Sequence, residues 1–148
     1  MTNPPVLPQP RAVPTVRDWD LTLLVALGGA VGSVGRWLVA TLVPTPDDGF
    51  AWSTWLVNIS GAFLIGLLPP LLARRRPGSR RSRPFLITGL LGGWTTFSTA
   101  MLDLHVLIMD GSVVVAAGYL VSTLVVGLLA VIGGDSCARW LLADRSAG

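Results

Sequence analysis

The chain has 148 residues, of which 51% are hydrophobic and only 13% charged, and its mean hydropathy is +0.65. About a quarter of the residues in a soluble domain are charged, so this composition excludes an ordinary soluble fold. All 11 basic residues are arginine and all 8 acidic residues are aspartate; six of the arginines gather between Arg74 and Arg83 rather than along a face, which argues against nucleic-acid binding. With a single cysteine and no P-loop, nucleophile-elbow or zinc-protease pattern, the chain is not expected to be an enzyme.

The chain opens with a proline-rich segment and continues with four apolar blocks. Residues 1–20 contain no apolar run, so we expect a disordered tail rather than a secretory signal. Each block is long enough for the roughly 20 helical residues that cross a hydrocarbon core. The expected spans are about 21–43, 51–73, 84–109 and 112–134. The sequence therefore predicts an all-α integral membrane protein, with a four-helix membrane domain over residues 21–142 and a short tail at 143–148.

The connector at residues 74–83 predicts the orientation of the chain. It carries six arginines, whereas the loops on the opposite side carry neither Arg nor Lys. Short loops rich in arginine stay in the cytoplasm, so we expect a multi-pass protein of the cell membrane with both termini cytoplasmic. The same arginines could also attract anionic membrane lipid, although their topological role explains them without it.

The first two spans contain polar residues at helical spacing. Gly28, Gly32 and Arg36 share one face, where the glycines allow close helix contact and Arg36 either anchors the helix at the interface or faces a water-filled vestibule. Thr54 and Asn58 share a face of the second span. The Asn58 amide could make a hydrogen bond between helices, or it could donate to an anion in a pore.

The third span contains the stretch GGWTTFSTA at residues 92–100, which is a poor helix former. A helix break here would leave free backbone groups in the membrane, which is tolerated only where they are buried in protein or line a cavity. Freed carbonyls suit a hard cation such as Na⁺, and the electropositive ring edge of Phe97 suits an anion. A close-packed helix interface would use the same small residues, and composition alone leaves these interpretations open.

Three motifs carry a resemblance to a known family. GGAVGSVGRW, STWLVNISGAF and GLLGGWTTFST closely resemble the Fluc (CrcB) family of fluoride channels, and the likeness covers about residues 21–134. The resemblance implies an antiparallel dimer with a third helix broken in mid-membrane, two narrow fluoride pathways and a structural Na⁺ held at the dimer centre by backbone carbonyls. It implies Na⁺ ligands at Gly92 and Thr95, and a fluoride pathway formed by Arg36, Thr54, Asn58, Phe97, Ser98, Thr99 and Thr123.

The mechanism that the resemblance implies is passive flow. Amides, hydroxyls and ring edges would replace the water around fluoride in a path too narrow for chloride. HF that enters from acidic surroundings ionises inside the cell, and the membrane potential then drives fluoride out. This chemistry lowers fluoride toxicity and needs neither an ATP site nor a coupling acid.

Two features depart from the family pattern. The second phenylalanine expected three residues after Phe97 is Ala100 here. A homodimer that inserts in both orientations also needs balanced loop charge, whereas this chain is strongly biased. We therefore favour a heterodimer with an oppositely oriented paralogue over a homodimer.

Two other classes of protein share some of these sequence features. One is a non-conducting subunit that only scaffolds its partner, an idea to which Ala100 lends support. The other is a small multidrug exporter, which needs a membrane-embedded acid in its first span. The predicted first span, residues 21–43, contains no acidic residue, so this class is disfavoured.

Overall fold

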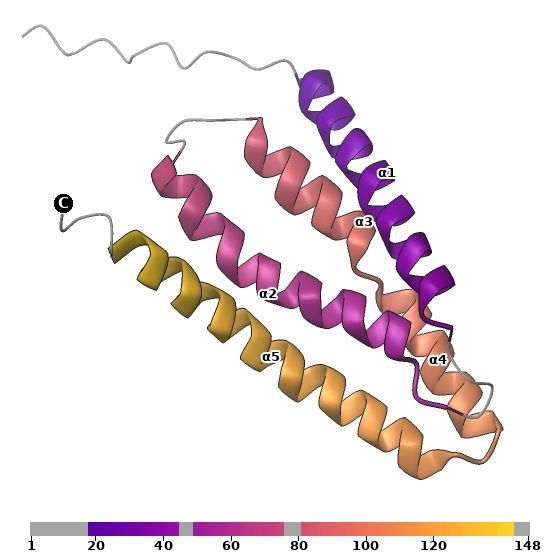
Figure 1. Ribbon diagram of the computed structural model, residues 1–148. Coiled ribbons are helices and arrows are strands. Elements are labelled where there is room, and N and C mark those ends of the chain that lie inside the picture. The colour runs from indigo at the N-terminus through magenta and orange to yellow at the C-terminus, as the bar shows by residue number, and fades with distance from the viewer. Residues whose placement is uncertain (1–17, 45–48, 76–80, 144–148) are drawn as a thin grey trace, which may run out of the picture.

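The computed structural model describes residues 18–44, 49–75 and 81–143, and the elements in these ranges are all helical (Figure 1). They are α1 (Asp18–Leu42), α2 (Trp52–Arg75), η1 (Pro84–Leu91), α3 (Gly92–Trp94), α4 (Phe97–Met109) and α5 (Val113–Ala143). Four segments are long and apolar enough to cross a membrane: Trp19–Leu42, Trp52–Arg74, Pro84–Met109 and Val113–Ala143. The predicted all-α membrane architecture is confirmed.

The ends of the spans differ in detail from the expected ones. α1 begins at Asp18, so the last residues of the expected 1–20 tail are helical, and the rest of that tail lies outside the described residues. α5 continues to Ala143, well past the expected end at Gly134. The remainder of the 143–148 tail, and parts of the connectors at 44–49 and 74–83, also lie outside the described residues.

The helices pack as two pairs that run roughly side by side. α2 packs along α5, and η1 with α3 packs along α1, as Figure 1 shows. Four helix termini lie at the same end of the bundle: the beginnings of α1 and η1, and the ends of α2 and α5. We call this end the arginine end, after Arg74, Arg81, Arg83 and Arg139. The tight turn between α4 and α5 lies at the opposite end (Figure 1).

The third span is broken in its middle, as its sequence predicts. It begins as a π-helix at Pro84, continues as one short α-helical turn, and leaves the helical conformation at Thr95 (φ −79°, ψ 156°) and Thr96 (φ −148°, ψ 120°). α4 then restarts the helix at Phe97. The π-helical start was not expected, because sequence carries little signal for this rare geometry.

Glycines bring α1 into backbone contact with the third span. A Cβ on Gly32 would overlap the carbonyl oxygen of Leu90, and a Cβ on Gly93 would overlap the carbonyl oxygen of Gly29. The close contact predicted for the Gly28 and Gly32 face is therefore confirmed.

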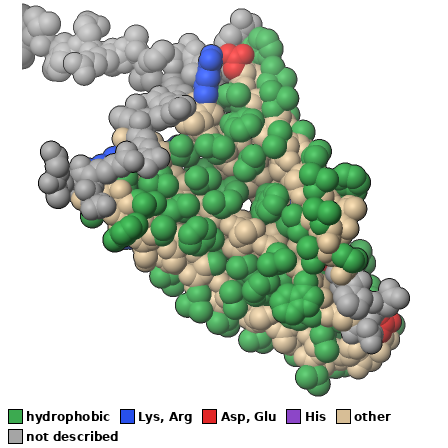
Figure 2. Space-filling view, in the orientation of Figure 1, with side chains coloured by type: hydrophobic (Ala, Val, Ile, Leu, Met, Phe, Trp, Pro, Cys, Tyr) green, Lys and Arg blue, Asp and Glu red, His purple; other side chains and the backbone are tan. Residues whose placement is uncertain are grey.

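The packed core lies towards the end of the bundle away from the arginines. It is made of small and aliphatic side chains around one buried aromatic ring, namely Ala51, Ala100, Leu107, Ala116 and Tyr119. α4 ends beside it in a Schellman turn, in which Gly111 (φ 78°) donates to Ile108 and Ser112 donates to Leu107. Hydrophobic side chains cover the middle of the face in Figure 2, and charged ones show only near its two ends. That distribution suits a lipid environment.

Candidate functional site: the helix break and its two cavities

The break in the third span is held by the side chain of Asn58 on α2. Asn58 Nδ2 donates to the carbonyl oxygen of Thr96 (2.9 Å), and the amide of Thr96 donates to Asn58 Oδ1 (2.8 Å). One side-chain amide thus satisfies both backbone groups of an extended residue within the membrane, where unsatisfied groups cost several kcal/mol each. Of the two roles that the sequence leaves open for Asn58, the hydrogen bond between helices is present in the structure. Because Nδ2 carries two hydrogens, one of them stays available for another acceptor.

The Thr96 side chain starts the second half of the span. Its hydroxyl accepts the backbone amide of Thr99 (3.2 Å), which makes Thr96 the N-cap of α4, and it donates to Thr99 Oγ1 (2.9 Å). The Ser98 hydroxyl lies 3.4 Å from Thr96 Oγ1. Three hydroxyl groups therefore gather at the first turn of α4, where the helix dipole is positive and anions are stabilised.

The break changes the environment of two particular carbonyl groups. In a continuous α-helix, the amide of Thr96 would bond to the carbonyl of Gly92, and the amide of Thr99 to that of Thr95. Here these amides bond to Asn58 Oδ1 and Thr96 Oγ1 instead. The carbonyls of Gly92 and Thr95, the two residues that the sequence resemblance implies as Na⁺ ligands, therefore do not receive these two amides.

Two further contacts fix α3 against α2. Trp94 Nε1 donates to Ser60 Oγ (2.9 Å), which in turn donates to the carbonyl oxygen of Val57 (3.1 Å). A Cβ on Gly61 would overlap the methyl group of Thr95, so the absence of a side chain there lets α2 lie directly against the break.

One cavity, of about 350 Å³, lies between α2, the break, α4 and α5. We call it the phenylalanine cavity. Three predicted pathway residues line it, Asn58, Phe97 and Thr123, and Ala100 forms part of its wall. The Phe97 side chain is 78% exposed in the single chain, so the surface around it is open. Thr123 Oγ1 donates its hydrogen to the carbonyl oxygen of Tyr119 (2.7 Å), which leaves its lone pairs for other contacts.

A second cavity, of about 240 Å³, lies on the other side of Thr96, between α1, α2 and α4. We call it the arginine cavity. Arg36, Thr54 and Thr99 line it, together with Ser33 and Ser53. Thr54 is only 7% exposed, yet its hydroxyl borders this space. Within the described residues no carboxylate pairs with Arg36, so a cation and several hydroxyls face one cavity.

The predicted pathway residues are therefore divided between two cavities that share Thr96. Asn58, Phe97 and Thr123 are brought together on one side of it, and Arg36, Thr54 and Thr99 on the other. Ser98 lines neither cavity and touches the group only through Thr96. Thr96 itself was missed as a site residue, although it stands in the quoted motif directly before Phe97. Its neighbours in the motif are predicted site residues. That the Thr96 hydroxyl borders both cavities, however, can be recognised only from the fold.

Three buried polar atoms near the packed core form a further feature that the sequence analysis did not interpret. Trp55 Nε1, Asp103 Oδ2 and Tyr119 Oη are buried, and none of them makes a hydrogen bond of good geometry in the described part of the chain, although the Asp103 carboxyl lies close to the Tyr119 hydroxyl. The ring of Phe50 contacts the rings of both Trp55 and Tyr119. Asp103 is the one acidic residue within the four expected spans, and an acid at membrane depth is by default a functional candidate. That rule could have identified it.

Comparisons with known proteins agree with the arrangement. The family model described as "CrcB-like protein, Camphor Resistance (CrcB)" matches residues 23–135. A "Fluoride-specific ion channel FluC 2" of Nocardia farcinica is 41% identical over 131 residues, which are 88% of this chain and 93% of that protein. A "Fluoride-specific ion channel FluC" of Agrobacterium fabrum is 47% identical over 117 residues, or 78% of this chain and 94% of the relative.

A third relative matches an even larger share of the chain. The "Fluoride-specific ion channel FluC 1" of Streptomyces coelicolor is 39% identical over 138 residues, which cover 90% of each protein. The family match spans all four helices and both halves of the broken one. This chain is therefore a member of the CrcB family.

Proposed function

We propose that the chain is a subunit of a fluoride-selective channel that lets cytoplasmic fluoride leave the cell passively and so lowers fluoride toxicity. The observation that carries the proposal is the polar helix break. It is flanked by one cavity that contains Phe97 and by another that contains Arg36, which pairs with no carboxylate in the described residues. The relatives that are named as fluoride-specific channels support the identity of the ion.

The residues around the break suit a small, strongly hydrated anion. Arg36 would attract anions into the arginine cavity, because a cation without a partner raises the local anion concentration. The second hydrogen of Asn58 Nδ2, the hydroxyls at the start of α4 and the ring edge of Phe97 would replace the water around the ion. Thr123 would contribute only after its hydroxyl turns away from the carbonyl of Tyr119. Donors held this close favour the smallest halide.

The break also fits a structural Na⁺. The carbonyls of Gly92 and Thr95 have lost their helical donors, and carbonyl oxygen is the ligand type that hard cations prefer. No group of His, Cys or Asp side chains in the described residues offers a competing metal site. Gly92 is exposed in the single chain, so the ion would lie at the surface of the subunit, where a second subunit supplies the remaining ligands.

A dimer is supported by the exposure of the site. A phenylalanine that is 78% exposed beside an open cavity leaves the pathway without one wall, and an antiparallel second subunit would provide it. In the described residues the arginines other than Arg36 lie at the arginine end of the bundle, which favours a single orientation for each chain. We therefore favour a heterodimer with an oppositely oriented paralogue, and the numbered names FluC 1 and FluC 2 among the relatives are in line with paired genes.

The test is fluoride efflux from liposomes that contain the purified chain alone, or the chain together with its paralogue. We expect efflux only with both chains, no chloride efflux, and loss of fluoride efflux when Na⁺ is replaced during purification. Efflux from the chain alone would support a homodimer and contradict the heterodimer. If neither preparation conducts fluoride, the channel proposal fails.

A second candidate, a non-conducting scaffold subunit, rests on Ala100. This residue lies in the wall of the phenylalanine cavity, where the family pattern has a second aromatic ring. Under this alternative, fluoride would flow only along the partner's residues. Phe97→Ile in this chain would then leave fluoride efflux through the heterodimer unchanged, whereas the channel proposal expects a loss of efflux.

A further inference from the structure

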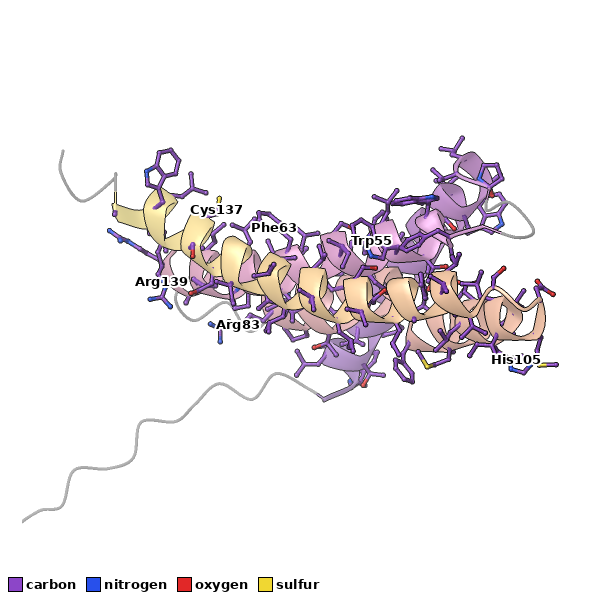
Figure 3. The ribbon with its side chains drawn as sticks, turned by 90° about the horizontal axis from the view of Figure 1, so that it is seen from below. Trp55, Phe63, Arg83, His105, Cys137 and Arg139 are labelled. Carbon is purple, nitrogen blue, oxygen red and sulfur yellow. The ribbon has the colours of Figure 1, made fainter. Side chains whose placement is uncertain are left out.

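The arginine end brings guanidinium groups together from three elements of the fold. Arg74 Nη1 donates to the carbonyl oxygen of Leu142 (2.8 Å), which holds the end of α2 against the end of α5. Arg139 lies one turn before Leu142 on α5, and Arg83 immediately precedes η1. Figure 3 shows the side chains of Arg83 and Arg139 at the same end of the bundle.

Most of the positive charge at this end is not neutralised within the described residues. The ion pair there joins Arg139 to Asp135, with Arg139 Nε 2.8 Å from Asp135 Oδ2. Arg74, Arg81 and Arg83 are exposed, and no carboxylate in the described part of the chain lies within ion-pair distance of them. The cluster therefore has charge available for an anionic partner.

The length of α5 places this cluster at the level of the lipid headgroups. A helix of 31 residues is about 46 Å long, whereas the hydrocarbon core is about 30 Å thick. Trp140, next to Arg139, is 68% exposed, as expected for an indole at the membrane–water interface. The last turns of α5 thus lie beside phosphate groups rather than acyl chains.

We propose that the Arg74, Arg83 and Arg139 cluster binds the headgroup of an acidic phospholipid. The planar guanidinium group pairs with phosphate through two parallel hydrogen bonds, and Arg74 is already oriented by its bond to Leu142. A zwitterionic lipid carries its own ammonium group beside the phosphate, so its headgroup has no net charge and is attracted less strongly by the same cluster. Basic groups between helices at one membrane face are a known type of site for acidic lipids. This inference does not depend on the ion that the protein conducts.

The experiment is native mass spectrometry of the full-length protein, exchanged into detergent with equal amounts of phosphatidylglycerol and phosphatidylcholine. We expect preferential retention of phosphatidylglycerol. Arg83→Gln should weaken it about fivefold, which corresponds to one arginine near a membrane surface. Asp135→Asn should strengthen it, because Arg139 then loses its carboxylate. His105→Gln, at the opposite end, is the matched control and should change nothing.

Three results would overturn the proposal. One is equal retention of the two lipids. Another is retention that neither Arg83→Gln nor Asp135→Asn alters, which would place any lipid elsewhere. The third is full displacement of the lipid by millimolar inorganic phosphate, which would show a phosphate site rather than a lipid site. Thermal unfolding in phosphatidylcholine alone checks that both variants are folded.

Discussion

Asn58 and Thr96 pair through two hydrogen bonds, so that a side chain of the second span completes the backbone of the third. The arrangement combines two roles that the sequence leaves as alternatives for Asn58. The side chain joins two helices, and the hydrogen that remains on Nδ2 can face an anion. Under the proposed function, the stability of the fold and the conduction of fluoride would both depend on this residue.

Replacement of Asn58 by alanine should lower both the stability of the fold and the rate of fluoride efflux. Both backbone groups of Thr96 would lose their partner, and each backbone group left unsatisfied within the membrane costs several kcal/mol. We expect a clearly lower thermal transition in detergent and at least tenfold slower fluoride efflux. Ser60→Ala removes a hydroxyl from the same helix. Because this hydroxyl accepts a hydrogen bond from Trp94 Nε1, its loss should lower stability with little effect on efflux. Equal effects of the two variants on efflux would contradict a direct role for Asn58.

Gly32→Ala tests the contact between α1 and the third span. The added methyl group would overlap the backbone of Leu90, and overpacking of this kind costs roughly 1–3 kcal/mol. The thermal transition should fall by several degrees. Gly118→Ala is the matched control, because nothing lies within 4 Å of its added methyl group. A Gly32→Ala protein as stable as the Gly118→Ala protein would show that the helices can move apart without cost.

Ala100→Phe tests the departure from the family pattern. Ala100 is only 4% exposed but lies on the wall of a cavity of about 350 Å³, which has room for a ring. We expect the variant to fold. Assayed together with the paralogue, it should carry fluoride up to about fivefold faster, because one aromatic contact contributes roughly 1 kcal/mol, which corresponds to about that change in rate. Slower efflux from a protein of unchanged stability would show that the ring blocks the path.

Arg36 tests the electrostatic role of the arginine cavity. Arg36→Gln removes the positive charge that faces the hydroxyl groups there, and we expect slower efflux at low fluoride concentration with a smaller effect near saturation. Arg36→Lys keeps the charge and should restore most of the rate. If the Gln and Lys variants conduct alike, Arg36 serves only as an anchor. Size-exclusion profiles of the variants would confirm that they assemble.

Much of the fold could be predicted because hydrophobic length and glycine content are local properties of the sequence. The four spans and the break near residues 95 and 96 follow from such signals. The extension of α5 to Ala143 does not, because the segment after Gly134 is polar enough to resemble a loop. Its helix is supported by the Asp135–Arg139 pair, whose four-residue spacing stabilises a helical turn.

The arrangement of the predicted site residues could not be predicted from the sequence. Sequence indicates that Asn58 needs a partner but cannot show that the partner is the backbone of Thr96, which lies 38 residues further along the chain. The division of the pathway residues between two cavities depends on how the helices pack, and so does the burial of Trp55, Asp103 and Tyr119. These are properties of the tertiary structure, for which no local motif exists.

The pairing of Asn58 with Thr96 also bears on how the chain is made. In lipid a lone third span has no donor or acceptor for the two backbone groups of Thr96, so as an isolated segment it is better accommodated as an unbroken helix. The kinked form becomes favourable once the second span has docked and offers its amide. We therefore expect the broken third span to form after membrane insertion, as a product of helix assembly rather than of translocation.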